Sequence, residues 1–447
     1  MTHDLIIIGA GPGGLDAALY AAKHGLSVAL IERHKVGGTC LNYGCIPTKA
    51  LYQNAKTIRS MHNLSTFGVH ADAFRLDYDT IKARKETIVS GQIDAVTMSL
   101  KKAGIDLIEG SARLQNDNTV TVGDATYQGN HVIIATGSKP KMLSFEGDDL
   151  PIIHTSKTIL DLEVFPKRLL VVGAGVIGVE LAQIFQSFDA DVTLVDFAGD
   201  ILLTEDKDVR KRARNLFKRQ GIDIHTNAAL TRVKQESDTY LATLTTKKGD
   251  VNVAVDAVLI AVGRAPNVGD LDLGNLGINH TPQGIRVDAN KRTSRDGVYA
   301  IGDVNGEWML AHKATYDGYR AVNHILDKTD TIRFDLVPSV IFSTPLIASV
   351  GVREDDLEGV EYKTSKALFK ANAKAVAMDD TDGFLKLIAD AKGQLVGAHI
   401  IGNGADFLIH EMTALIQKGT TISEAHDIIH AHPTVSEVVH DALRQLD

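Results

Sequence analysis

The chain has 447 residues, of which 44% are hydrophobic and 23% charged, and its formal net charge is −9. This is the composition of an ordinary globular protein, and the length suits two to four domains. The acidic balance argues against a general nucleic-acid binder. The sequence has no apolar run near the roughly 18 residues of a membrane span, and its polar start leaves no room for a signal peptide. We therefore expect a cytoplasmic protein without a membrane or nucleic-acid partner.

Residues 5–32 predict a unit that binds a dinucleotide. A buried strand, a glycine turn, an apolar-periodic helix and a second strand follow one another there. Gly9 permits the tight turn, Gly11 lets a pyrophosphate approach the backbone, and Gly14 lets helix and strand pack closely. Glu32 ends the second strand, where a carboxylate can bind ribose hydroxyls.

Cys40 and Cys45, the two cysteines of the chain, come next. The apolar spacing over residues 46–59 predicts a helix, and we expect both cysteines at its start. Unpaired backbone N–H groups and the helix dipole favour a thiolate there. A disulfide closing so short a loop removes little chain entropy, so a redox-active pair is the favoured interpretation.

Spacing alone leaves two other interpretations of the cysteines open. Two buried thiols that never react would fit it, as would half of a metal site with His34. A structural zinc site usually needs four protein ligands, and the sequence has no second cysteine pair. We therefore expect no metal.

The dinucleotide pattern occurs a second time, after a long helix predicted over 81–103 and short strands over 105–134. Here the glycines are Gly173, Gly175 and Gly178, and the acid that ends the second strand is Asp196. Two copies, each with its acid at the same spacing, are a strong signal for two dinucleotide sites.

The second site is predicted to prefer NAD(H) over NADP(H). Asp196 would repel a 2′-phosphate, and no arginine or lysine follows within the next several residues to bind one. Beyond it, residues 206–220 predict a charged helix with a solvated face. Alternation over 231–256 predicts a meander on the edge of the sheet.

The C-terminal part ends in a candidate acid–base pair, His432 and Glu437. Imidazole titrates near neutral pH and can take a proton from a thiol, and the carboxylate would orient it. Two alternatives remain: Thr434 and Glu437 have the spacing of a helix capping box, and His432 could be a plain surface residue. Strands are predicted near 339–352, 362–370 and 384–400, and helices over 311–326, 405–418 and 435–446.

Taken together, these motifs resemble those of the flavin disulfide reductases, over nearly the whole chain. The matching stretches are the cysteine segment at 37–49, strand-to-loop signatures at 135–138 and 261–264, a flavin signature at 299–303, and the His–Glu motif at 430–437. Residues 309–313 and 384–401 are similar to the lipoamide branch. Mercuric reductases share much of the pattern but carry a C-terminal cysteine pair, which this chain lacks.

The resemblance implies an α/β fold with two Rossmann-like domains, one for FAD and one for NAD, and a C-terminal α+β dimerisation domain. The implied boundaries are 1–145 for the first FAD segment, 146–262 for the NAD domain, 263–335 for the returning FAD or central segment, and 336–447 for the interface domain.

The resemblance also implies the residues that bind each cofactor. Those for FAD are Gly9, Gly11, Gly14, Glu32, Thr39, Lys49, Ala112, Thr136, Gly137, Asp303 and Ala311. Those for NAD are Gly173, Gly175, Gly178, Glu180, Asp196, Leu230 and Gly263.

For catalysis, the resemblance implies that Cys40 exchanges with substrate and Cys45 faces the flavin, with Lys49 and Glu180 as an ion pair beside it. A solvated Lys49 is the alternative. His432 and Glu437 would serve the partner's active site in a homodimer. The implied reaction is oxidation of dihydrolipoamide by NAD⁺, within a complex that supplies a lipoyl domain and an acyltransferase subunit. A reductase of another disulfide or small oxidant, and a non-catalytic binding subunit, are the competing hypotheses.

Overall fold

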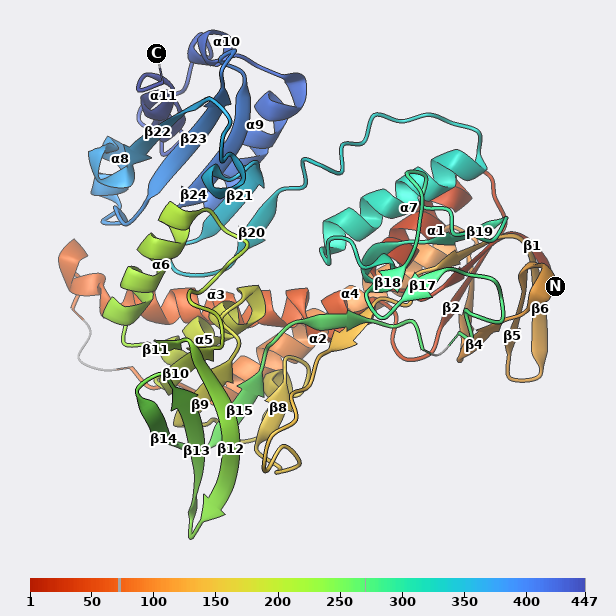
Figure 1. Cartoon of the computed structure of the whole chain (residues 1–447), viewed down its shortest axis with the longest axis horizontal. Coiled ribbons are helices and arrows are strands. Elements are labelled where there is room, and N and C mark those ends of the chain that lie inside the picture. Colours follow the sequence, from red (N-terminus) through yellow and green to blue (C-terminus); the bar gives the residue numbers. More distant parts are fainter. Residues whose placement is uncertain (71–73, 270, 447) are drawn as a thin grey trace.

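The computed structural model describes residues 1–70, 74–269 and 271–446. Three lobes are visible in Figure 1: one holds both chain segments around β1 and α7, one holds the sheet around β9, and one holds the C-terminal sheet around β23. Within the described residues, no helix is both long and apolar enough to cross a membrane.

The first lobe is built on a sheet of order β3-β2-β1-β6-β5-β4, to which β19 adds beside β6. Its central strand β1 is apolar throughout Leu5–Ile8 and fully buried, as a parallel strand covered on both faces requires. The strands are β1 (Thr2–Ile8), β2 (Val28–Glu32), β3 (Asp106–Glu109), β4 (Ala112–Leu114), β5 (Thr119–Val122), β6 (Ala125–Ile134) and β19 (Val298–Ala300).

Two helices far apart in the sequence cross closely on this sheet. These are α1 (Pro12–Lys23) and α7 (Ala311–Ile325). A Cβ added to Gly318 would lie 3.0 Å from both Ala17 Cβ and the Gly13 carbonyl oxygen, so a glycine is needed at this crossing. The second chain segment thereby returns to the first lobe at β19 and α7.

The second lobe repeats the parallel arrangement, with a sheet of order β11-β10-β9-β15-β8. Its elements are β8 (Ile153–Thr155), β9 (Arg168–Val172), α5 (Val176–Ser187), β10 (Asp191–Asp196), α6 (Lys207–Arg219), β11 (Asp223–Thr226) and β15 (Ala257–Ile260). A two-stranded link, β7 (Ser138–Pro140) with β16 (Arg264–Pro266), joins the two lobes.

The predicted meander forms, but its predicted place on the edge of the parallel sheet is wrong. β12 (Ala228–Glu236), β13 (Thr239–Thr246) and β14 (Gly249–Val255) make a three-stranded sheet of their own. The reason is burial: Leu230, Val233 and Leu244 pack in one core with Leu170 and Val258 of the parallel sheet, so the meander covers a face.

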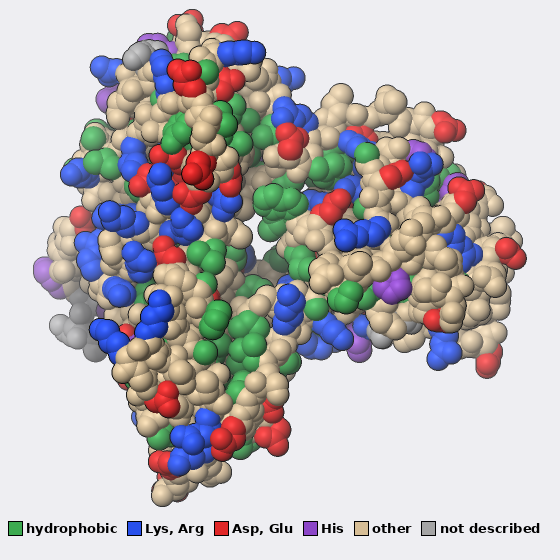
Figure 2. All heavy atoms as spheres, in the orientation of Figure 1, with side chains coloured by type: hydrophobic (Ala, Val, Ile, Leu, Met, Phe, Trp, Pro, Cys, Tyr) green, Lys and Arg blue, Asp and Glu red, His purple; other side chains and the backbone are tan. Residues whose placement is uncertain are grey.

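The predicted charged helix forms as α6, and part of it is solvated as predicted: Lys207, Lys211, Lys218 and Arg219 are exposed. One side of α6 buries Val209, Ala213, Leu216 and Phe217. Its charged side pairs with the C-terminal lobe, for example Arg210 with Asp355 at 2.7 Å. Figure 2 shows Lys and Arg side chains gathered over this helix, beside acidic side chains of the neighbouring lobe. Counter-charges from a distant segment therefore cover part of the charged face of α6, and the rest of that face stays exposed.

The third lobe is an antiparallel sheet of order β20-β21-β24-β23-β22 with helices on it. Its elements are β20 (Ser339–Ile341), β21 (Ile347–Gly351), β22 (Tyr362–Leu368), α8 (Ala373–Ala377), β23 (Phe384–Asp390), β24 (Leu395–Ile401), α9 (Ala405–Lys418), α10 (Ile422–His426) and α11 (Glu437–Leu443). The last helix is shorter than predicted at both ends, because Ser436 is its N-cap and Arg444 its C-cap.

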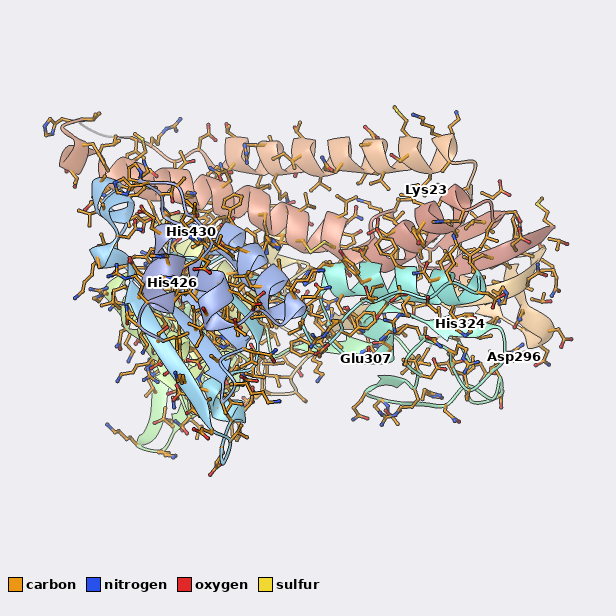
Figure 3. All side chains as sticks on the ribbon, turned by 90° about the horizontal axis from the view of Figure 1, so that it is seen from above. Lys23, Asp296, Glu307, His324, His426 and His430 are labelled. Atoms are coloured by element: carbon orange, nitrogen blue, oxygen red, sulfur yellow. A yellow bond between two sulfur atoms is a disulfide. The ribbon has the colours of Figure 1, made fainter. Side chains whose placement is uncertain are left out.

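Two long helices run side by side across the molecule, as Figures 1 and 3 both show. They are α3 (Cys45–His62) and α4 (Tyr78–Lys102), and the short α2 (Gly38–Tyr43) precedes them. The remaining hairpin is β17 (His280–Thr281) with β18 (Gly284–Ile285). Short 3-10 turns lie at Leu64–Phe67, Asn116–Asn118, Ile159–Asp161, Gly302–Asn305, Glu354–Asp356 and Phe369–Ala371. α3 reaches from the first lobe to the second and packs on α5.

A buried ion cluster fastens the second lobe to the third. Lys386 on β23 is 1% exposed and binds Asp206 at 2.8 Å, Asp208 at 2.9 Å and Glu354 at 2.5 Å. Burial by itself raises the pKa of Glu354, but hydrogen bonds from Lys386 and Lys207 outweigh it and lower that pKa to about 2. Glu354 therefore stays charged at neutral pH.

We predict that Lys386→Met lowers the free energy of unfolding by about 3–5 kcal/mol, because it leaves the buried Asp206 without a counter-charge. Lys366→Met is the matched control: its pair with Asp208 is partly exposed, and its loss costs less than about 1 kcal/mol. Urea unfolding followed by circular dichroism measures both. Equal losses in the two variants would contradict the buried role of Lys386.

Candidate active site

A disulfide joins Cys40 and Cys45, whose Cα atoms are 4.6 Å apart. Cys45 is the first residue of α3, as predicted, but Cys40 lies inside the preceding α2. Gly44 separates the two helices with φ −145° and ψ −105°, and a Cβ there would lie 3.1 Å from the Thr39 carbonyl oxygen. The positive end of the α3 dipole is therefore directed at Cys45 alone, which favours a thiolate on that sulfur.

Both cysteines are taken up by this bond. Over the described part of the chain, no group of three or more His, Cys, Asp and Glu side chains is placed to hold a metal ion. His34 lines the same cavity as the cysteines but has no such group around it.

A cavity of about 2060 Å³ opens beside the disulfide. That volume exceeds the 300–1,000 Å³ of typical small-molecule pockets, and it suits an extended cofactor. Every residue predicted to bind FAD lines it: Gly9, Gly11, Gly14, Glu32, Thr39, Lys49, Ala112, Thr136, Gly137, Asp303 and Ala311. The structure thus brings together segments from residue 9 to residue 311 around one space.

The two glycine turns have nearly the same geometry. A Cβ on Gly14 would lie 1.9 Å from the Gly9 carbonyl oxygen, and one on Gly178 would lie 1.8 Å from that of Gly173. These distances allow no side chain. The third glycine of each motif is therefore required for the close packing of helix on strand, as the sequence predicts.

The middle glycine of each turn has a different surrounding. A Cβ on Gly11 or Gly175 would meet no protein atom within 4 Å. Both positions face open space at the N-terminus of a helix, α1 or α5, where backbone N–H groups can receive a pyrophosphate. The residues present therefore fit a dinucleotide at each turn.

The acidic residue of each copy lies against its turn. The Ala10 N–H donates to Glu32 at 2.8 Å, and the Ala174 N–H donates to Asp196 at 2.6 Å. These bonds fix each carboxylate at the end of its strand, with capacity left to accept ribose hydroxyls.

The residues predicted for NAD are less tightly gathered. Glu180 lines the large cavity, whereas Gly173, Gly175, Gly178, Asp196, Leu230 and Gly263 do not. The glycines and Asp196 form the second turn described above. The Leu230 side chain is buried in the core beneath the meander, so only its backbone is available to a ligand.

Lys49 and Glu180 form an ion pair at 2.9 Å that joins α3 to α5. Glu180 is 5% exposed and also accepts the Phe342 N–H at 2.9 Å. The Lys49 ammonium lies 4.4 Å from the centre of the Phe342 ring. The charge of Glu180 is thus fully paired, and Lys49 is held in the cavity wall rather than free in solvent.

Sequence reasoning gave no role to Ser138 and Arg264, which the structure places on Asp303. The Ser138 hydroxyl donates to the Asp303 carboxylate, and Arg264 Nε donates to that hydroxyl at 2.7 Å. Burial lowers the pKa of Arg264, and the nearby Asp303 opposes this shift. Both residues lie in the strand-to-loop signatures, which was the available signal. They orient Asp303 toward the cavity.

His432 Nδ1 and Glu437 Oε1 are hydrogen-bonded at 2.8 Å. The other oxygen of Glu437 accepts the Thr434 N–H at 3.0 Å, but the alternative capping box does not form: Ser436 is the N-cap of α11, and the Thr434 hydroxyl donates to the Ala431 carbonyl. The bond from His432, followed by that from Thr434, lowers the pKa of Glu437. An ionised carboxylate thus orients the imidazole.

Within one chain, this pair and the disulfide are not brought together. The His432 side chain is 74% exposed and does not line the cavity. Figure 3 places the neighbouring His430 on the C-terminal lobe, where it pairs with Glu411 at 2.9 Å. Sequence reasoning missed this second His–Glu pair, because its members are far apart in the chain.

Comparison with family models decides the class of protein. Residues 3–318 match the model of the pyridine nucleotide-disulphide oxidoreductases, and residues 337–443 match the dimerisation domain of that family. The chain belongs to this family. It is an FAD- and pyridine-nucleotide-dependent oxidoreductase with a redox disulfide at Cys40–Cys45, and its C-terminal lobe supports a homodimer.

Similar proteins cover nearly the whole chain. A dihydrolipoyl dehydrogenase of Chlamydia pneumoniae is 37% identical over 97% of this chain and 95% of its own length. One of Geobacillus stearothermophilus is 36% identical over 98% and 95%. A leghemoglobin reductase of Vigna unguiculata is 35% identical over 98% of this chain and 87% of its own.

Solved structures agree on the α/β architecture. LpdA of Mycobacterium tuberculosis superposes with a TM-score of 0.91 at 27% identity, covering 99% of both chains. RclA of Escherichia coli, described as an HOCl-induced flavoprotein disulfide reductase, gives 0.89 at 29% identity, over 99% of this chain and 100% of its own. The predicted fold class is confirmed. So are the predicted cofactors, FAD and NAD, which the family's dihydrolipoyl dehydrogenases use.

We predict that Asp196→Ala weakens NADH binding roughly tenfold and NADPH binding much less, because the carboxylate accepts the ribose hydroxyl in one and repels the 2′-phosphate in the other. Equilibrium titration with both nucleotides measures this. Asp191→Ala, an exposed change on the same strand, is the control and should alter neither. Equal effects of Asp196→Ala on both nucleotides would remove the ribose role.

Proposed function

We propose that this protein is a dihydrolipoyl dehydrogenase, which oxidises dihydrolipoamide with NAD⁺. The observation that carries the proposal is the Cys40–Cys45 disulfide, held at the start of α3 in the wall of the FAD-sized cavity. The dihydrolipoyl dehydrogenases among the relatives, at 34–37% identity over 97–98% of this chain, support the choice of substrate.

In this proposal, His432 of the partner subunit takes the proton from one thiol of dihydrolipoamide. The resulting thiolate attacks the Cys40 sulfur, which breaks the Cys40–Cys45 bond and leaves Cys45 as a thiolate. The second substrate thiol attacks the substrate sulfur that is joined to Cys40. This breaks the bond to Cys40, and the proton of the second thiol passes to the released Cys40 sulfur, which becomes a thiol. Lipoamide leaves with its disulfide closed, and the protein has gained two electrons.

Each remaining residue has a part in this scheme. The helix dipole of α3 stabilises the Cys45 thiolate, and Glu437 stabilises the imidazolium of His432. Lys49 is on α3, which begins at Cys45, and Glu180 is on α5, which begins at the second glycine turn. The pair therefore places one positive and one negative group between the disulfide and the proposed NAD site. When bound, FAD supplies the two-electron path from the dithiol to NAD⁺.

The proposal includes assignments that follow from the substrate. The protein would act in the cytoplasm as the shared component of a 2-oxoacid dehydrogenase or glycine-cleavage system, and would meet a lipoyl domain and an acyltransferase subunit there. The boundaries 1–145, 146–262, 263–335 and 336–447, and the residue roles at both nucleotide sites, belong to the same proposal.

A reductase of another disulfide or small oxidant is the second candidate. The likeness to RclA favours it, because that enzyme aligns over the whole chain and has also been solved as a Cu(II) complex. Turnover rates with lipoamide and with other oxidants, measured on one preparation with NADH, separate the two. Fast lipoamide reduction supports the dihydrolipoyl dehydrogenase, and weak lipoamide turnover beside fast turnover of another oxidant supports the second candidate.

We predict that His432→Ala lowers the turnover of dihydrolipoamide by roughly 100-fold or more, because it removes the general base. FAD content and the reduction of bound flavin by NADH should stay unchanged. Glu437→Gln keeps one of the two acceptor oxygens but removes the charge, and should cost less. A loss in His432→Ala below about fivefold would end its assignment as the base.

A further inference from the structure

A polar network ties two distant parts of the chain to one face of α5. Glu180 and Gln183 lie three residues apart, so their side chains leave the helix on the same side. Both are polar and almost completely buried, with exposures of 5% and 2%. Burying them is favourable only if their polar atoms are paired, and the pairing shows what the network holds.

The first part it holds is the segment 342–345 of the C-terminal lobe. Glu180 accepts the Phe342 N–H at 2.9 Å, and Gln183 Oε1 accepts the Thr344 N–H at 2.5 Å. The carbonyl of Thr344 accepts from Gln220 Nε2 at 2.8 Å, and Gln183 Nε2 donates to Gln220 Oε1 at 3.0 Å. Two side-chain amides thus satisfy both peptide groups of Thr344.

The second part is α3, the helix that begins at Cys45. Arg59 Nη2 donates to the backbone carbonyl of Gln183 at 2.8 Å, near the far end of that helix. Lys49, near its start, binds Glu180. α3 is therefore fastened to α5 at two points, one on each of the two buried residues.

Phe342 connects this network to the ion pair. Its N–H binds Glu180, while its ring lies 4.4 Å from the Lys49 ammonium and 5.6 Å, edge to face, from the ring of Tyr52. The segment therefore closes over the pair from the side of the C-terminal lobe. If this segment moved, Glu180 would lose the N–H that donates to it, and Lys49 would lose its contact with the Phe342 ring.

We infer that Gln183 is a positioning residue: by holding the segment 342–344 on α5, it fixes the Lys49–Glu180 pair beside the flavin and so sets the rate of electron exchange with the nucleotide. The inference rests on the roles proposed above for Lys49 and Glu180. Without the amide, the Thr344 N–H would lose its acceptor in a buried site, and the Thr344 carbonyl would keep Gln220 but lose the longer of its two donors, Gln183 Nε2 at 3.4 Å. The segment would move to recover a partner for the N–H. Small displacements of groups around a reaction centre are costly to its rate.

The test uses the full-length holoenzyme with Gln183→Met, which keeps an unbranched side chain of similar length but removes the amide. Gln186→Met, on the same helix and outside the network, is the matched control. Anaerobic stopped flow measures two half-reactions separately, reduction by NADH and reduction by dihydrolipoamide, with dithiothreitol as a second thiol. FAD content and amide hydrogen exchange of residues 342–344 are measured on the same samples.

We expect Gln183→Met to slow the NADH half-reaction roughly tenfold and to change the thiol half-reaction by less than about twofold. FAD content should be unchanged and exchange at 342–344 faster, while the control resembles the parent. If both half-reactions slow equally, or neither does, the inference is overturned. Should the variant lose FAD, Gln220→Met replaces it, with the same selective loss expected. That change removes the nearer donor to the Thr344 carbonyl and the acceptor of Gln183 Nε2, but keeps the bond from the Thr344 N–H to Gln183.

The same experiment tests the proposed function independently of the role of Gln183. If the parent protein reacts with dithiothreitol but not with dihydrolipoamide, the proposed function fails. The comparison of NADH with dithiothreitol in Gln183→Met still decides the role of Gln183.

Discussion

The ion pair between Lys49 and the buried Glu180 is the contact on which the active-site arrangement depends. A carboxylate that is 5% exposed is tolerable only with its counter-charge in place, so α3 and α5 must meet at this point. α3 begins at Cys45, and α5 begins at the second glycine turn. The pair therefore joins the disulfide to the nucleotide site, and Phe342 of the C-terminal lobe completes its surroundings.

The N-termini of three helices lie at the wall of the same cavity. Pro12, Cys45 and Val176 are the first residues of α1, α3 and α5, and all three line it. Each helix directs unpaired N–H groups and the positive end of its dipole toward the space beside it. That environment suits the anionic groups of the chemistry: a pyrophosphate at each glycine turn and a thiolate at Cys45. Helix N-termini thus serve both the binding of the dinucleotides and the redox chemistry of the disulfide.

The sequence predicted the structure best at positions where steric crowding permits only one type of residue. Gly14 and Gly178 admit no Cβ, so the two turns, their strands and their acids could be predicted. Cys45 at the start of a helix followed from apolar spacing. The residues themselves suggested the cysteine pair and the pair of His432 with Glu437, and the resemblance implied both. Lys49 with Glu180 was expected from the resemblance alone. The structure brings each pair together.

Contacts that depend on distant segments could not be predicted. Nothing near α6 shows that Asp355 and Lys386 would meet its charges, and nothing near Gln183 shows that Thr344 would bind it. The same limit applies to the meander, whose alternation is equally consistent with an edge strand or a covering sheet. The structure also leaves His432 outside its own cavity, so the account requires the partner subunit.

The most direct test of the central claim is an anaerobic titration of the purified holoenzyme with NADH, followed in the visible, and then with lipoamide. The account predicts a long-wavelength absorbance band from a Cys45 thiolate against the flavin, and a rapid return of the oxidised spectrum when lipoamide is added. Bleaching of the flavin without such a band would mean that Cys40 and Cys45 lie outside the electron path, and would contradict the account.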